Sequence, residues 1–121
     1  TGQGLRVLVV DDQPMVLKTM GAVLSSLGHS VALYADPEEA YRVFASGPAA
    51  VDLAIVDLEM TPVNGLQLAD KLHSLREELP VIIATGECLN TIELPRQTRH
   101  IDKPFRVAQL RETLKLAMSC D

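Results

Sequence analysis

The sequence predicts an α/β fold in which helices cover both faces of a five-stranded parallel sheet. Three observations favour it. Short aliphatic runs alternate with amphipathic segments, the central runs are apolar without interruption, and 121 residues make one ordinary domain. Uninterrupted apolar runs are typical of parallel strands that are buried on both faces. Because crossovers between parallel strands are right-handed, we expect the doubly wound strand order 2-1-3-4-5.

The first two predicted units are each a short strand followed by a helix. Residues 5–10 (LRVLVV) are rich in branched residues, which favours a strand. Pro14 suits the first turn of a helix that Gly28 ends as a left-handed cap. A second strand is expected at residues 31–34. Asp36 then offers a capping oxygen to the second helix.

The rest of the chain continues this alternation, with one segment that is harder to interpret. Between residues 86 and 99 the helical periodicity is weak, so we expect a fourth helix that is short or irregular. The other elements have clear patterns and are expected as strands at residues 53–56, 81–84 and 100–101, and as helices at residues 66–75 and 106–118.

Composition excludes several classes of protein. The 16 acidic and 11 basic residues give a net charge of −5, which the phosphate backbone of a nucleic acid would repel. No apolar run approaches the roughly 20 residues that cross a membrane, and the first residues lack a secretory signal pattern. Cys88 and Cys120 form no CxxC motif, which favours reduced thiols over a disulfide or a metal pair. We expect a cytoplasmic domain at residues 5–121, cut from a longer protein, with residues 1–4 as a tag or linker remnant.

Polar side chains follow four of the five predicted strands. Asp11 and Asp12 follow the first strand, Asp57 the third, Thr85 the fourth and Lys103 the fifth. In a doubly wound sheet the carboxyl ends of the strands meet at one edge, where ligands bind. Each residue alone has a simpler interpretation, as a helix cap, a hydroxyl bonded to backbone or a solvated lysine. Their joint placement indicates one polar crevice.

The chemistry of this crevice fits phosphoryl transfer. Clustered carboxylates repel one another, and Mg²⁺ prefers such oxygen ligands. A lysine ammonium suits a phosphate oxygen, and a threonine hydroxyl can donate to another. A carboxylate can itself accept a phosphoryl group as an acyl phosphate. Asp57 is the candidate nucleophile, because it stands singly at the central strand beside acids that can bind the metal.

The strand ends carry five short motifs: VVDD at residues 9–12, IVDLEM at 55–60, NG at 64–65, ATG at 84–86 and DKPF at 102–105. In order and position they resemble the receiver domain of two-component response regulators, over residues 5 to about 118. The resemblance implies a CheY-like (βα)5 fold of the flavodoxin-like type. It also implies a signalling domain rather than an enzyme. The chemistry of such a domain is limited to Mg²⁺-dependent phosphoryl transfer to itself and autodephosphorylation.

The resemblance further implies how a phosphoryl group and Mg²⁺ would be held. Asp57 would be the phosphoacceptor, supplied by a histidine kinase or a histidine phosphotransfer domain. Asp12 and Asp57 would ligate Mg²⁺ together with the backbone carbonyl of Glu59. Asp11 would act through a metal-bound water.

The remaining implied roles concern switching and the lifetime of the acyl phosphate. Lys103 would contact the phosphoryl group, and Thr85 would turn toward it to begin a conformational change. Glu59 and Glu87 stand two positions after Asp57 and Thr85, where the family tunes phosphoryl lifetime. His100 occupies the position of the family's switch aromatic. The signal would pass to an output domain or target protein, and a homodimer is possible.

Two other functions fit part of the pattern. A phosphatase of the haloacid dehalogenase type also uses strand-end Asp, Thr and Lys. It needs a DxDx motif after the first strand, which DDQP at residues 11–14 does not supply. A receiver-like domain could instead signal by contact without phosphate, but the complete set of acids disfavours this. The segment from residue 85 to 103 is shorter than usual in the family by roughly a helical turn, which keeps this second alternative open.

Overall fold

The fold was obtained as a computed structural model, which describes residues 4–47, 50–60, 64–86, 98–102 and 106–119. The described elements, in chain order, are β1 (Arg6–Val10), α1 (Pro14–Ser26), β2 (Ser30–Tyr34), α2 (Pro37–Ser46), β3 (Leu53–Asp57), α3 (Gly65–Leu75), β4 (Val81–Thr85), β5 (Thr98–Asp102) and α4 (Val107–Ser119). Every strand predicted from the sequence is present, and α4 is the helix expected at residues 106–118. The short or irregular helix expected between residues 86 and 99 falls on a segment that lies almost wholly outside the described residues.

The five strands form one parallel sheet in the order β2-β1-β3-β4-β5, which confirms the predicted topology. The register places Val10 of β1 beside Val56 of β3, and Asp57 of β3 beside Ala84 of β4. The carboxyl ends of these three strands therefore lie almost level. Residues that follow them meet at the same edge of the sheet.

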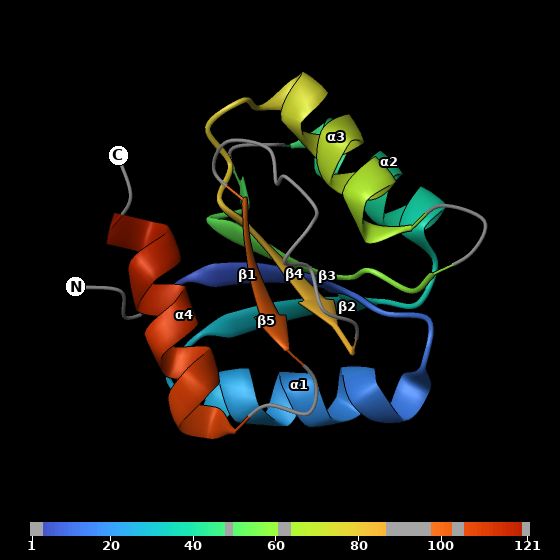
Figure 1. Cartoon of the computed structure of the whole chain (residues 1–121). Helices are drawn as coiled ribbons and strands as arrows, with labels where there is room; N and C mark the ends of the chain where they lie inside the picture. The colour runs from blue at the N-terminus through green and yellow to red at the C-terminus, as the bar shows by residue number, and fades with distance from the viewer. Residues whose placement is uncertain (1–3, 48–49, 61–63, 87–97, 103–105, 120–121) are drawn as a thin grey trace.

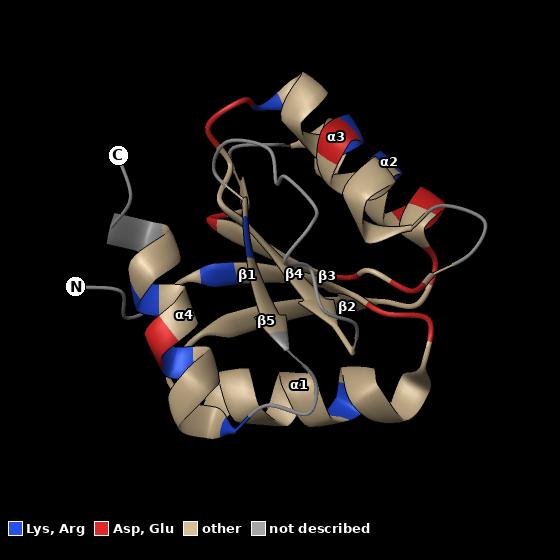
Figure 2. Ribbon diagram, in the orientation of Figure 1, with Lys and Arg blue, Asp and Glu red and all other residues tan. Residues whose placement is uncertain are grey.

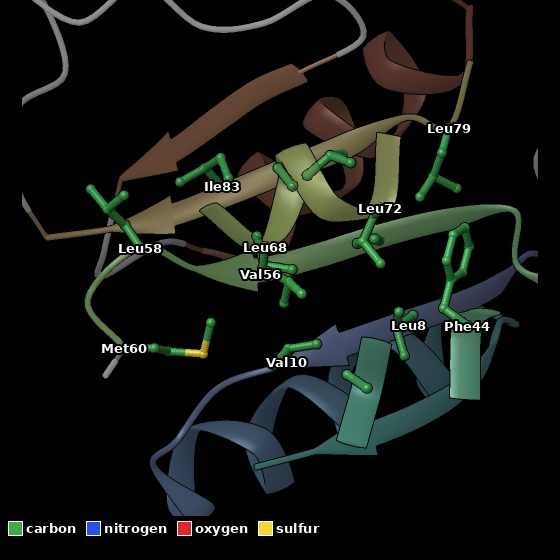
Figure 3. Close-up of a cluster of buried hydrophobic side chains, with 14 residues drawn as sticks. Leu8, Val10, Phe44, Val56, Leu58, Met60, Leu68, Leu72, Leu79 and Ile83 are labelled. Carbon is green, nitrogen blue, oxygen red and sulfur yellow. The ribbon is translucent and has the colours of Figure 1, made fainter. Parts of the chain in front are cut away.

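Helices cover both faces of the sheet, with α1 and α4 on one face and α2 and α3 on the other (Figure 1). Each pair encloses its own cluster of buried aliphatic side chains. Phe44 of α2 and Leu68 and Leu72 of α3 belong to the cluster on their face of the sheet (Figure 3). On the opposite face, Leu24 of α1 and Leu110 of α4 belong to the second cluster.

The strands contribute to the two clusters in alternation, because successive side chains of a strand point to opposite faces. In β3, Val56 belongs to the cluster under α2 and α3, whereas Ile55 belongs to the cluster under α1 and α4. All five residues of β3 and all five of β4 are buried. Two-sided burial explains why these strands are continuous apolar runs rather than alternating ones.

The helix ends largely follow the predicted signals. Pro14 lies in the first turn of α1, and Gly28 after that helix has φ of 93°, in the left-handed region. The Asp36 carboxylate accepts a hydrogen bond from the Glu38 N–H at 3.0 Å and so caps α2. Within the described part of the chain, no helix has both the length and the apolar character needed to cross a membrane.

The start of α3 differs slightly from the prediction. The helix begins at Gly65, one residue earlier than expected, because Asn64 and Gln67 form a reciprocal capping box. The Asn64 side chain accepts from the Gln67 N–H at 2.9 Å, and the Gln67 side chain accepts from the Asn64 N–H at 3.0 Å. These two bonds fix where the chain enters α3 after β3.

Candidate functional site

Three polar side chains are buried at the carboxyl edge of the sheet. Asp11 directly follows β1, Asp57 is the last residue of β3, and Thr85 is the last residue of β4. Their exposed fractions are 3%, 3% and 0%. Figure 2 shows acidic segments at the ends of β1 and β3, on the same side of the sheet. Because burying charged groups is costly, their presence together indicates a functional site rather than a packing role.

Asp11, Asp12 and Asp57 form a cluster of carboxylates. One oxygen from each of the three lies within 4.8 Å of the others. Asp11 and Asp57 are buried, whereas Asp12 is exposed to solvent. Three negative charges at this spacing repel one another, and a divalent cation bound among them would remove the repulsion. The donor set consists of oxygen alone, which suits a hard cation such as Mg²⁺.

The backbone holds Asp11 between two elements. Its N–H donates to the carbonyl oxygen of Tyr34 at the end of β2, at 3.1 Å. Its carboxylate Oδ1 accepts a hydrogen bond from the Gln13 N–H at 2.9 Å, directly before α1. The carboxylate is thereby directed at the turn between β1 and α1, where the sequence places Asp12.

Asp57 is held by the loop that leaves β3. The Leu58 N–H donates to the carbonyl oxygen of Ala84 at 2.9 Å, which extends the pairing of β3 with β4 one residue past Asp57. The Gly65 N–H donates to the carbonyl oxygen of Leu58 at 3.1 Å, which ties the start of α3 to this loop. The Asp57 Oδ1 accepts a longer hydrogen bond from the Glu59 N–H at 3.4 Å.

The Glu59 side chain makes a contact that was not predicted. The Thr85 hydroxyl donates a hydrogen bond to Oε2 of Glu59. Thr85 is fully buried and Glu59 is exposed, so the contact joins the end of β4 to the surface of the loop after β3. The sequence shows only that Glu59 stands two residues after Asp57. That spacing does not determine which way its side chain turns.

Comparison with known protein families identifies a family for this chain. The family model for the response regulator receiver domain matches residues 7–115. This chain belongs to that family. The receiver domain is 42% identical over 84 residues to the gliding motility regulatory protein of Myxococcus xanthus, with 68% of this chain and 11% of that protein covered. It is 39% identical over 80 residues to the transcriptional regulatory protein GlrR of Escherichia coli strain K12, with 66% and 18% covered. The match thus spans less than a fifth of either relative's length.

Solved structures agree on the fold of the receiver domain. The receiver domain of sensor histidine kinase PA1611 from Pseudomonas aeruginosa superposes with a TM-score of 0.83 at 23% identity, over 97% of this chain and 99% of that chain. That structure has a magnesium ion coordinated in its active site cleft. At this level of identity the likeness establishes the shared architecture.

Three other residues were predicted to belong to the site of the receiver domain. Lys103 and Glu87 lie outside the described residues. His100 lies within β5, beside Ile83 of β4, and is exposed. It lines a groove of about 390 Å³ between β5 and α4, together with side chains such as Gln109. The role of His100 as a switch residue stays a prediction.

Proposed function

We propose that this receiver domain is a phosphorylatable switch in which Asp57 accepts a phosphoryl group from a histidine kinase or a histidine phosphotransfer domain. The observation that carries the proposal is the cluster of Asp11, Asp12 and Asp57, with one oxygen of each within 4.8 Å of the others. Asp57 stands at the end of a central strand that is buried throughout. Such a strand fixes the carboxylate rigidly beside the other two acids.

Asp12 and Asp57 would hold Mg²⁺ with their carboxylates, and Glu59 would add its backbone carbonyl. Asp11 would act through a bound water. Support comes from the all-oxygen donor set of the cluster and from the magnesium ion in the related PA1611 receiver domain. When bound, Mg²⁺ supplies charge neutralisation for the phosphoryl oxygens during transfer.

The chemistry at Asp57 is the transfer of a phosphoryl group from a phosphorylated histidine of the donor to the Asp57 carboxylate. A bond forms between the Asp57 carboxylate oxygen and phosphorus while the phosphorus–nitrogen bond of the donor histidine breaks. Lys103 would contact the phosphoryl group, and the Thr85 hydroxyl would donate to one of its oxygens. Water would later hydrolyse the acyl phosphate. Glu59 and Glu87, two positions after Asp57 and Thr85 in the sequence, would affect how readily water enters.

The phosphoryl group would then change the conformation of the domain through Thr85 and His100, and so control an output domain or a partner protein. We infer that residues 5–121 form the receiver domain of a longer cytoplasmic protein. The greater length of the relatives supports this inference. The domain would act as a signalling element without a separate substrate, would not bind nucleic acid or membrane itself, and could form a homodimer.

The proposal is tested by intact-mass spectrometry after incubation with acetyl phosphate or phosphoramidate. We expect one phosphoryl adduct in the presence of Mg²⁺, none in EDTA and none for Asp57→Asn. Asp11→Asn should take up phosphoryl more slowly, because it weakens metal binding. Asp70→Asn, an exposed carboxylate on α3, serves as the matched control and should behave as wild type. An equal adduct on Asp57→Asn would refute the site. No adduct from either donor would favour signalling by contact alone.

A further inference from the structure

One contact at the site involves the side chain of Glu59, to which the proposed function gives a role only in water access to the acyl phosphate. Glu59 approaches the site twice. Its backbone N–H donates to Oδ1 of Asp57 at 3.4 Å, and its side-chain carboxylate accepts from the hydroxyl of Thr85. The Glu59 carboxylate is therefore bound to the same hydroxyl that is expected to contact a phosphoryl group on Asp57.

The Thr85 hydroxyl carries one proton, so it can donate one strong hydrogen bond at a time. In the unphosphorylated domain this proton is directed at Glu59. A phosphoryl oxygen on Asp57 needs the same proton. A carboxylate is a strong acceptor, because charge-assisted hydrogen bonds are stronger than those between neutral groups. The phosphoryl group must therefore displace Glu59 before Thr85 can turn.

Charge acts in the same direction as this competition. Glu59 stands two residues from Asp57, and its backbone already touches that carboxylate. A phosphoryl group would bring further negative charge to Asp57, and like charges at short range repel. Because Glu59 is exposed, its side chain can move into solvent when repelled. Phosphorylation would thus drive the Glu59 carboxylate away from Thr85 and make the Thr85 hydroxyl available to the phosphoryl group in one event.

We propose that the Glu59 side chain is a positioning residue that holds Thr85 in its unphosphorylated arrangement and competes with the phosphoryl group for the hydroxyl. Glu59 thereby sets how readily phosphorylation switches the domain. This inference rests on the proposed function of Asp57. It concerns the side chain of Glu59 alone, and substitutions there keep the backbone carbonyl that would ligate Mg²⁺.

The test measures the affinity for beryllofluoride with Mg²⁺, a stable analogue of the phosphoryl group, by calorimetric titration. Wild type, Glu59→Ala, Thr85→Val and the double variant form a complete cycle. We expect Glu59→Ala to bind the analogue about tenfold more tightly than wild type, since both repulsion and competition are lost. With Val at position 85 no hydroxyl is contested, so the same change should gain only about threefold, from lost repulsion.

If Glu59→Ala raises the affinity for beryllofluoride equally with Thr and with Val at position 85, the inference is overturned, because Glu59 would then act by charge alone. Glu59→Gln keeps an acceptor without the charge and should bind with an affinity between those of wild type and Glu59→Ala. Glu77→Ala removes an exposed acid before β4, at the opposite edge of the sheet, and should leave the affinity unchanged. As a second readout, the ¹³C shift of the Thr85 methyl in free Glu59→Ala should move toward its value in the wild-type complex.

The outcomes also separate this inference from the proposed function. If wild type does not bind beryllofluoride, or binds it equally when Asp57 is replaced by Asn, the proposed function fails. If wild type binds it through Asp57 but the cycle shows equal gains, only the role of Glu59 fails.

Discussion

Gly65 lies so close to the backbone carbonyl of Asp57 that a Cβ on Gly65 would stand 2.6 Å from that oxygen. The neighbouring atoms are also backbone, with the Leu58 Cα at 2.9 Å, so no side chain can rotate away to make room. Glycine at the first position of α3 thus allows the helix to begin directly against the end of β3. The position of α3 and that of the candidate phosphoacceptor are coupled through this contact.

Gly65→Ala should therefore destabilise the domain and disturb Asp57. We expect a loss of about 2 kcal/mol in the free energy of unfolding, which is typical of overpacking against atoms that cannot yield. Urea unfolding measures the loss, and the rate of phosphoryl uptake reports the displacement of Asp57. Gly86→Ala is the control: a Cβ there meets nothing within 4 Å, and the expected change is below about 0.5 kcal/mol. Similar losses in both variants would contradict this account.

Mg²⁺ should stabilise the folded domain through the acidic cluster. At one hundred times the dissociation constant, a ligand of the folded state adds about 2.7 kcal/mol. Asp12→Asn should lose most of this gain, because a candidate ligand carboxylate is removed. In EDTA the same variant should match or slightly exceed wild type, since one of three repelling charges is gone. Thermal unfolding with EDTA and with Mg²⁺ compares the two proteins, and Asp70→Asn controls for charge. An undiminished Mg²⁺ gain in Asp12→Asn would exclude it as a ligand.

The ion pair of Arg6 with Asp52 should make stability depend on pH. The Arg6 guanidinium donates to both Asp52 oxygens, at 3.2 and 3.1 Å, and the Arg6 N–H donates at 2.8 Å. The hydrogen bonds from the Arg6 side chain are the main cause that holds the pKa of the Asp52 carboxyl below its ordinary value of 3.8, and the bond from the Arg6 N–H adds to it. A lowered pKa gives stability that is fully present above the ordinary value and is lost as pH falls through the folded-state pKa.

Asp52→Asn should accordingly be less stable than wild type at neutral pH, by a small margin because the pair is partly exposed. The margin should close as the pH falls below 3.8. Urea unfolding across a pH series measures it. Added salt should also narrow the margin at neutral pH, because it screens exposed charges. A margin that is constant with pH would show that Asp52 contributes by packing rather than by charge.

The sequence was sufficient to predict the sheet and the meeting of its acids. Residues 53–56 are apolar at every position, which requires burial on both faces, and Asp57 follows them directly. Parallel strands then bring Asp57 to the edge where Asp11 lies. The capping-box spacing of Asn64 and Gln67 also marks the start of α3 at Gly65, but the helix was predicted to begin one residue later, at residue 66.

Other contacts depend on side-chain directions that spacing does not determine. Arg6 and Asp52 are 46 residues apart and meet only because β1 and β3 are neighbours in register. The bond from Thr85 to Glu59 depends on the rotamer of a loop glutamate, one of several that its backbone allows. Neither pair belongs to a local motif, so each became visible only with the folded chain.

The two aliphatic clusters have no residue in common within the described part of the chain, and the peptide layer of the sheet separates them. A change of side-chain volume under α1 and α4 can reach the cluster under α2 and α3 only by bending strand backbone, so substitutions on opposite faces should have nearly additive effects. The acidic cluster belongs to neither interior. Over evolutionary time, the residues on one face of the sheet can therefore change to suit new partners, while the residues on the other face and the acidic cluster are kept.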